Sequence, residues 1–211
     1  MKGRQDAQAV DRSGLRLRLL KQQAQAGDIV LLFEDESEAL THPYLAHAWA
    51  RRGADLRVAA PGQARKVAMI GALDVAAGTL IVETSRTKRS SDFIALLTRL
   101  DQLYAPRPGR QAKPVVLVLD NGPIHTSKAS RAALADRPWL AVEWLPKYAP
   151  ELNAEEYLNN DLKGAINAAG LPGSRGELRS RIEWFMSRLL HLPQHVRSYF
   201  RHPCVQYAAG D

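Results

Sequence analysis

The alternation of apolar and polar positions along the chain predicts five strands and five helices. Short, nearly continuous apolar runs or period-two alternation indicate strands, and apolar residues recurring every three or four positions indicate helices. The predicted strands cover 29–33, 66–74, 79–83, 115–119 and 140–145. The predicted helices cover 13–26, 91–104, 126–136, 154–169 and 175–192. The expected caps are Ser13 and Gly27 for the first helix and Thr126 or Ser127 for the third.

The order of these elements predicts an α/β fold. Three antiparallel strands followed by alternating helices and strands form a mixed sheet with helices on both faces. This is the layout of a ribonuclease-H-like fold, although several other mixed α/β folds share the same order. The order of elements therefore predicts the class and leaves the particular fold open.

Composition narrows the class of protein. The chain has 211 residues, of which 45% are hydrophobic and 24% charged, as in an ordinary globular protein of one domain. Its single cysteine, Cys204, excludes an internal disulfide and any cysteine-based zinc or iron–sulfur cluster. No apolar run approaches the length of a membrane span, and the first ten residues lack the apolar core of a signal peptide, so we expect a cytoplasmic protein without a membrane partner.

Charge is the first indication of a partner. Twenty-nine Lys and Arg residues against 22 Asp and Glu residues give a net charge of +7. This balance suits a polyanion such as nucleic acid, but many basic proteins bind none.

Three acidic residues stand out by their positions in the predicted fold. Asp35 follows the first strand, Asp120 closes the strand at 115–119, and Glu156 lies at the start of a helix. Strand ends are where open α/β sheets bind ligands, and carboxylates gathered there repel one another unless cations neutralise them. Carboxylate oxygens suit Mg²⁺ and Mn²⁺. Taken singly, each acid is also explained as a turn, cap or helix-start residue.

Each acid has neighbours that compete with it. Period-two alternation puts Glu34 and Glu36 on the sheet face opposite Asp35. Glu155 lies about 100° around the predicted helix from Glu156. One polar stripe of that helix holds Glu156, Asn160, Lys163 and Asn167.

Three segments together resemble the acidic motifs of the Asp-Asp-Glu transposases, most closely the bacterial insertion-sequence branch of the mariner superfamily. These segments are LLFEDESEAL, VLVLDNGPIHTSKA and LPKYAPELNAEEYLNNDLK. The second carries Asp120, Asn121 and His125 in the family's arrangement, and 35 residues separate Asp120 from Glu156, as the family spacing requires. The family's third motif is matched by Leu145, Pro146, Tyr148, Pro150, Leu152, Asn153 and Glu156. The match selects Asp35 and Glu156 over their acidic neighbours.

The resemblance implies a function as well as a fold. It implies a ribonuclease-H-like catalytic domain over 29–170, flanked by a basic helical extension over 1–28 and a C-terminal helical region over 171–211. Asp35, Asp120 and Glu156 would be both the catalytic residues and the ligands of two Mg²⁺ or Mn²⁺ ions. Cleavage and strand transfer of DNA, at transposon ends and in target DNA, would follow, with a homodimer as the working form.

Further residues are candidates for contact with DNA. They are Asn121, His125, Lys163, Arg86, Lys88 and Arg89. His125 could orient a phosphate, brace the Asp120 loop or bond to the local backbone. Each basic residue could equally be an ordinary solvated side chain. Trp49 is expected to pack in the core or in an insertion rather than stack on DNA.

The sequence departs from the family in its N-terminal segment and in its third motif. Only 28 residues precede the first predicted strand, too few for the family's helix-turn-helix region, so we expect the catalytic half alone. Ala154 and Glu155 stand where the family has Pro-Ile, and Asn159 where it often has tryptophan. A catalytically inactive or domesticated nucleic-acid-binding remnant, and a nuclease acting on RNA–DNA hybrids, are the alternative functions.

Overall fold

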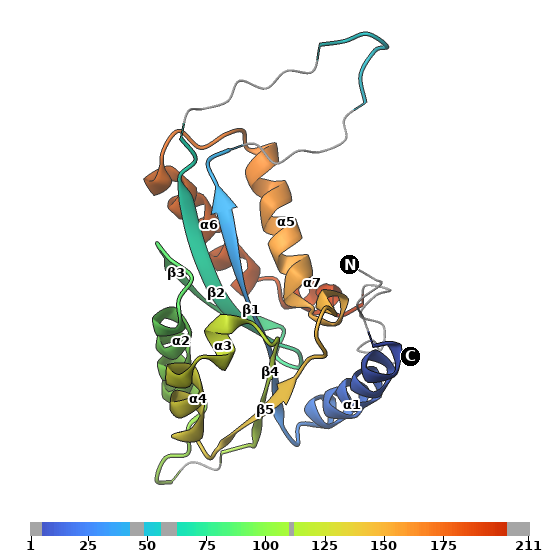
Figure 1. Ribbon diagram of the computed structural model, residues 1–211, viewed down its shortest axis with the longest axis vertical. Helices are drawn as coiled ribbons and strands as arrows, with labels where there is room; N and C mark the ends of the chain where they lie inside the picture. Colours follow the sequence, from blue (N-terminus) through green and yellow to red (C-terminus); the bar gives the residue numbers. More distant parts are fainter. Residues whose placement is uncertain (1–5, 43–48, 56–62, 110–111, 202–211) are drawn as a thin grey trace.

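The computed structural model describes the chain apart from residues 1–5, 43–48, 56–62, 110–111 and 202–211 (Figure 1). The strands are β1 (Val30–Leu40), β2 (Lys66–Asp74), β3 (Thr79–Ser85), β4 (Val115–Leu119) and β5 (Leu140–Trp144). The helices are α1 (Ala7–Ala26), α2 (Ser90–Tyr104), α3 (Pro123–Thr126), α4 (Lys128–Ala135), α5 (Glu155–Ala168), α6 (Arg175–Leu190) and α7 (Pro193–Tyr199), with a 3₁₀ turn at Pro150–Leu152. Within the described part of the chain, none of the helices has the length and apolar character needed to cross a membrane.

The strands form one mixed sheet in the order β3-β2-β1-β4-β5. β1 lies at the centre, antiparallel to β2 and parallel to β4, while β3 and β5 form the edges. The antiparallel half comes from consecutive strands, and the parallel half needs crossovers through helices. The predicted mixed α/β class is therefore confirmed.

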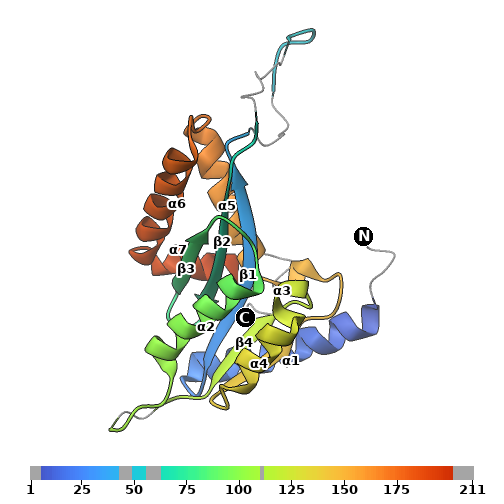
Figure 2. The ribbon, with the colours of Figure 1, turned by 60° about the vertical axis from the view of Figure 1, so that its left-hand side comes forward.

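Two apolar cores cover the two faces of this sheet. Alternate residues of β1 and β4 point to opposite faces, so Leu31 and Val118 join one core while Leu32 and Leu117 join the other. The first core also takes residues from α1, α5, α6 and α7, and the second from α2 and α4. Figure 2 shows α2 and α4 on one side of the sheet and α5 and α6 on the other. The helices on both faces are as predicted.

β1 is much longer than the apolar run that predicted it. The prediction ended at residue 33, but the strand continues to Leu40, paired with β2 throughout. Asp35 therefore lies inside the strand and does not follow it. The error has a physical cause: residues 34–38 are polar on both faces, which is typical of a loop, yet Glu34 and Ser37 are buried in the protein.

The helices differ most from the prediction at the start of α1 and in the two short helices α3 and α7. α1 begins at Ala7, capped by the Asp6 carboxylate, so Ser13 is not its N-cap; Gly27 ends it as predicted, in the left-handed conformation that favours glycine. Of the two predicted caps for α4, Thr126 and Ser127, the structure shows Ser127. The short helices α3 and α7 were not predicted, although proline begins each of them.

Trp49 was expected to pack inside the protein. Its side chain is instead fully exposed. Because it lies in the connection between β1 and β2, beyond the end of the sheet, no core residue covers it.

Candidate active site

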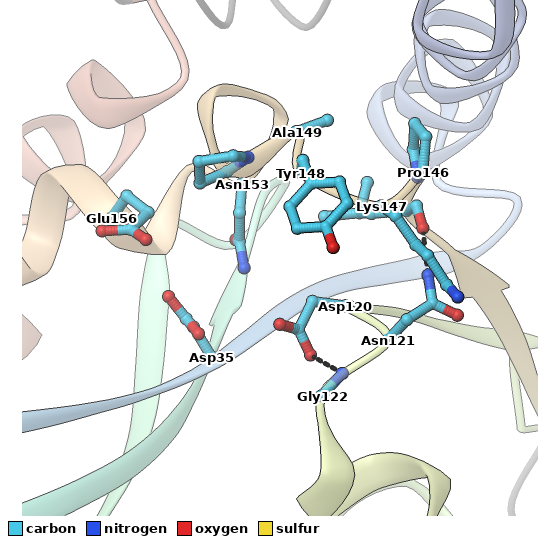
Figure 3. Close-up of a pocket in the computed structure, with 12 residues that line it drawn as sticks. Asp35, Asp120, Asn121, Gly122, Pro146, Lys147, Tyr148, Ala149, Asn153 and Glu156 are labelled. Atoms are coloured by element: carbon cyan, nitrogen blue, oxygen red, sulfur yellow. Dashed lines mark hydrogen bonds between the residues drawn. The ribbon is translucent and has the colours of Figure 1, made fainter. Parts of the chain in front are cut away.

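Asp35, Asp120 and Glu156 line one pocket of about 460 Å³. They come from three separate elements: the middle of β1, the residue after β4 and the first turn of α5. Figure 3 shows the Asp35 carboxyl group between those of Glu156 and Asp120. The fold thus brings together the three acids singled out in the sequence. Separate roles as turn, cap or helix-start residues would not explain why all three line the same pocket.

The sheet register places the first two acids side by side. β1 and β4 pair in parallel from Val30–Val115 to Phe33–Val118. Continuing this register two residues brings Asp35 level with Asp120, on the same face of the sheet. Parallel pairing therefore fixes their relative position through backbone hydrogen bonds alone.

The third acid is carried by a helix whose start is tied to β1. Asn153 is buried, and its side-chain amide donates to the Glu34 backbone carbonyl at 2.9 Å. Its side-chain oxygen accepts from the Glu155 backbone N–H at 3.2 Å, which satisfies a donor at the start of α5. Glu156 is the next residue, and it faces the pocket as the predicted polar stripe requires. The sequence motif contained Asn153 but did not indicate this role.

The charges in the pocket favour a cation. Burial raises the pKa of Asp35 well above its ordinary value, and the nearby negative charge of Glu156 raises it further. Both effects mean that the ionised carboxylate lacks compensation in the protein itself. The donor set is all oxygen from carboxylates, which suits Mg²⁺ or Mn²⁺. The residues of the pocket therefore fit a hard divalent ion.

Asp120 is held differently from the other two acids. Its Oδ1 atom accepts from the Gly122 backbone N–H and from His125 Nδ1, both at 2.7 Å. The His125 hydrogen bond lowers the pKa of Asp120. About half of the Asp120 side chain stays exposed, so its second oxygen is free to face the pocket.

His125 sits in a buried acidic cluster behind the pocket. Its Nε2 atom lies 2.9 Å from Glu34 Oε2 and 3.5 Å from Glu36 Oε2. Burial alone would lower the pKa of His125, but the charge of Glu34 and the Asp120 hydrogen bond raise it to about 11. These contacts favour the protonated imidazole, and Glu34, whose pKa burial raises to about 7, lies closest to its Nε2 atom. Glu34, Glu36 and His125 each offer a ligand atom within 4.8 Å of the others, so this cluster could also hold a metal ion.

His125 is fully buried, which corrects one of its predicted roles. No part of its side chain is on the surface, so it cannot contact a DNA phosphate. Bracing the Asp120 loop was the alternative, and the Nδ1 contact supports it.

Glu155, the rival of Glu156, is also buried, but outside the pocket. Burial raises its pKa well above normal, and the charge of Asp35 adds to the effect. A Cβ atom placed on Gly71, the β2 partner of Asp35, would lie 2.7 Å from Glu155 Oε1 and 3.1 Å from the Ile81 carbonyl oxygen. Only glycine leaves room there for the Glu155 side chain.

Substituting Gly71 with alanine should therefore disturb the start of α5. We expect a loss of about 1–3 kcal/mol in the free energy of unfolding, because the backbone carbonyl cannot move aside. Urea denaturation measures this. Gly164→Ala is the matched control: this exposed glycine lies within α5 with nothing near its added Cβ, and alanine there should gain about 0.5–1 kcal/mol. Equal stability of the two variants would contradict the crowding at Gly71.

Of the candidate DNA contacts that are not buried, one lines the pocket and four lie outside its lining. Asn121 lines it, and its amide donates to the Leu145 carbonyl at 2.5 Å. Arg86, Lys88 and Arg89 are exposed between β3 and α2, and Lys88 lies 4.0 Å from Glu36. Lys163 is partly exposed on α5 but does not line the pocket.

Two pocket residues were missed as site residues. Lys147 is exposed at the pocket, and a cation there can meet a phosphate. Tyr148 has φ of 62°, a rare conformation for a bulky residue, and in Figure 3 its ring is drawn above Asp120. Tyr148 was part of the matched motif, whereas Lys147 had no signal beyond its charge.

Comparison with known proteins shows which family the chain matches. Residues 30–179 match the family described as DDE superfamily endonuclease. The chain is 31% identical over 163 residues to an uncharacterized 39 kDa protein of insertion element IS630 from Shigella sonnei. That match takes in 77% of this chain but 46% of the relative, so the chain spans about half the length of that curated protein.

Solved structures confirm the ribonuclease-H-like fold. The crystal structure of the catalytic domain of Mos1 mariner transposase is similar with a TM-score of 0.55 at 20% identity, covering 98% of this chain and 97% of that one. The Mos1 transposase paired-end complex with left transposon end has a TM-score of 0.60 at 19% identity, covering 97% of this chain and 63% of that chain.

Proposed function

Because the chain belongs to the DDE superfamily of endonucleases, we propose that it is the catalytic part of a transposase that cuts DNA strands and joins them to new sites. The observation that carries the proposal is the meeting of Asp35, Asp120 and Glu156 in one pocket. They come from distant parts of the sequence, and their mutual repulsion is the arrangement that divalent ions relieve.

The three carboxylates would hold the ions. Two bound Mg²⁺ or Mn²⁺ ions would activate the attacking oxygen and stabilise the leaving oxygen of an in-line displacement at phosphorus. Asp35 lies beside both other acids and would contact both ions, while Asp120 and Glu156 would each contact one. Asp120 would use its Oδ2 atom, since Oδ1 is engaged by Gly122 and His125.

The pocket serves two successive displacements. In the first, water attacks a backbone phosphorus, the bond to the 3′ oxygen breaks, and a 3′ hydroxyl leaves. In the second, that hydroxyl attacks a phosphorus of the target strand, the bond from this phosphorus to the target's 3′ oxygen breaks, and a target 3′ hydroxyl leaves, so that the two DNAs are joined. Both displacements share one arrangement of attacking and leaving oxygens, so one set of acids suffices.

Basic residues in and outside the pocket would bind the DNA backbone. Lys147 lines the pocket, and the exposed side chains of Arg86, Lys88 and Arg89 form a group near Glu36. Lys163 and Asn121 complete the proposed contacts. Contacts of this kind position DNA without reading its sequence.

The substrates we propose are transposon ends and target DNA. Mos1 transposase, which shares the fold, forms a paired-end complex with a transposon end. By that similarity we propose that two copies of this chain act together on paired ends.

Nicking of supercoiled plasmid DNA tests the proposed function. With protein in molar excess over plasmid, we expect open-circular product in Mg²⁺ or Mn²⁺ and none with EDTA, because the acids alone cannot stabilise the leaving oxygen. Strand transfer is then followed with a pre-cut, labelled end. Binding of DNA without metal-dependent nicking would favour the inactive remnant, and preferential cutting of RNA–DNA hybrids would favour a ribonuclease-H-like nuclease.

A further inference from the structure

The residue just before Asp35 contacts the supports of both other acids. Glu34 is completely buried, and its side chain points to the sheet face opposite the pocket. It therefore cannot be one of the pocket's ligands. Its backbone carbonyl and its carboxylate nevertheless contact two different residues, Asn153 and His125.

The carboxylate of Glu34 reaches the support of Asp120. It lies 2.9 Å from His125 Nε2, and His125 Nδ1 binds Asp120 Oδ1 at 2.7 Å. The imidazole is fully buried and packs edge-on against the Phe93 ring, with 4.8 Å between the ring centroids. His125 is thus a rigid spacer between β1 and the carboxylate that follows β4.

The backbone carbonyl of Glu34 reaches the support of Glu156. It accepts the 2.9 Å hydrogen bond of Asn153, and Asn153 in turn accepts from the Glu155 N–H. The N-cap residue of α5, Ala154, makes no side-chain cap. Asn153 is therefore the side chain that fixes where α5 begins relative to β1.

We propose that Glu34 is a positioning residue that sets the spacing of the three pocket carboxylates, its side chain acting on Asp120 through His125 and its carbonyl on Glu156 through Asn153. The inference rests on the proposed function, because the spacing of the carboxylates matters only if they bind metal ions. A pair of metal ions tolerates only small displacements of its ligands.

Stability alone does not explain a glutamate at this position. Neither of its carboxylate oxygens makes a hydrogen bond, and Oε2 has the ion-pair contact with His125 Nε2 at 2.9 Å as its partner. Burying a carboxylate with an unpaired oxygen costs free energy, and an apolar side chain of similar volume is often neutral or stabilising in such a place. What glutamate provides and an apolar residue cannot is the anionic contact to His125.

The same cluster could instead hold a metal ion of its own. Against this, Glu34 Oε2 and His125 Nε2 are 2.9 Å apart, the separation of an ion pair. Two ligands of one tetrahedral zinc ion, each about 2.0 Å from it, would lie about 3.3 Å apart. We therefore assign the contact to positioning, and the experiment includes the other outcome.

Mn²⁺ binding to the whole chain, followed by electron paramagnetic resonance, tests the proposal. We compare wild type with Glu34→Gln, which keeps the shape but removes the charge, and with His125→Gln. Both should bind Mn²⁺ about 10- to 100-fold more weakly, the usual loss when a residue that orients a metal ligand is changed. Nicking should recover at higher Mn²⁺ concentration, as a purely structural defect would not. Thermal unfolding without metal should change little in Glu34→Gln, because His125 keeps Asp120 and Glu36 as partners.

The matched control is Glu38→Gln on the same strand. Glu38 pairs with Lys66 at the surface, away from the pocket, so its substitution should leave Mn²⁺ affinity unchanged. Asn153→Asp tests the backbone arm separately: aspartate has the same shape but cannot donate to the Glu34 carbonyl, and it too should weaken Mn²⁺ binding. This variant and His125→Gln carry the test if Glu34→Gln does not fold.

The outcomes distinguish failure of the positioning role from failure of the proposed function. Wild-type affinity in Glu34→Gln, or in both His125→Gln and Asn153→Asp, would overturn the positioning role and leave the proposed function intact. A loss of one bound Mn²⁺ per chain in Glu34→Gln, with the remaining sites unchanged, would identify the cluster as a metal site and also overturn positioning. A wild-type chain that neither binds Mn²⁺ nor nicks DNA would overturn both proposals.

Discussion

Asp120→Asn is expected to lower the rate of plasmid nicking by about 10³-fold or more, the scale of loss when an essential member of a catalytic group is removed. Asparagine keeps the size of the side chain and can still accept from the Gly122 N–H and from His125. It cannot supply the negative charge that a divalent ion requires. The loss should therefore fall on the chemistry and leave the fold in place.

The experiment compares purified proteins at equal concentration in Mg²⁺, with the far-ultraviolet circular dichroism spectrum as the check on folding. Asp136→Asn is the matched control, since this exposed aspartate at the end of α4 lies outside the pocket. Wild-type nicking by the Asp120 variant would remove this residue from the proposed ligand set. Equal losses in both variants would point to a general effect of lost charge on DNA binding.

Glu156→Gln and Glu155→Gln should behave in opposite ways although the residues are adjacent. Glu156 lines the pocket, so its amide variant should lose about 10³-fold in nicking, on the same ground as Asp120. Glu155 is buried away from the pocket lining with its Oε2 atom unpartnered, and its charge is opposed by Asp35. Removing that charge should leave nicking within about tenfold and leave stability unchanged or higher.

Plasmid nicking and urea denaturation of the two variants, run side by side, measure these effects. Each variant is the control for the other, since both remove one negative charge from the first turn of α5. The reverse ranking, with Glu155→Gln inactive and Glu156→Gln active, would show that the sequence motif was aligned one residue out of register.

The short-range pattern of apolar and polar residues was enough to predict most elements, and a sequence motif was enough to select three acids that line one pocket. β4 was predicted to the residue because VVLVL is buried on both faces, and apolar runs of that kind are typical of parallel strands. The second half of β1 was not predicted because its burial depends on partners elsewhere in the chain. Glu34 can be buried only because His125, 91 positions later, faces it, and no local window contains that information.

The same reason explains what was missed in the site. Alternation correctly put Glu34 and Glu36 on the face away from Asp35, which removed them as candidate ligands. It gave no indication that the opposite face supports the pocket. The roles of Asn153 and Gly71 are likewise contacts between distant segments, to the Glu34 carbonyl and to the Glu155 side chain. Residue type and spacing cannot reveal such contacts.

β1 pairs with β2, which is near in the sequence, and with β4, which is far away, and this difference has a consequence for folding. The β2–β3 hairpin forms from local contacts, whereas pairing β1 with β4 must first close a loop of more than seventy residues. Glu156 lies further along the chain again. The pocket therefore comes into existence only after the slow, long-range steps, so a partly folded or still-growing chain would carry Asp35 without any capacity to cut DNA. The proposed metal binding would therefore indicate that folding is complete.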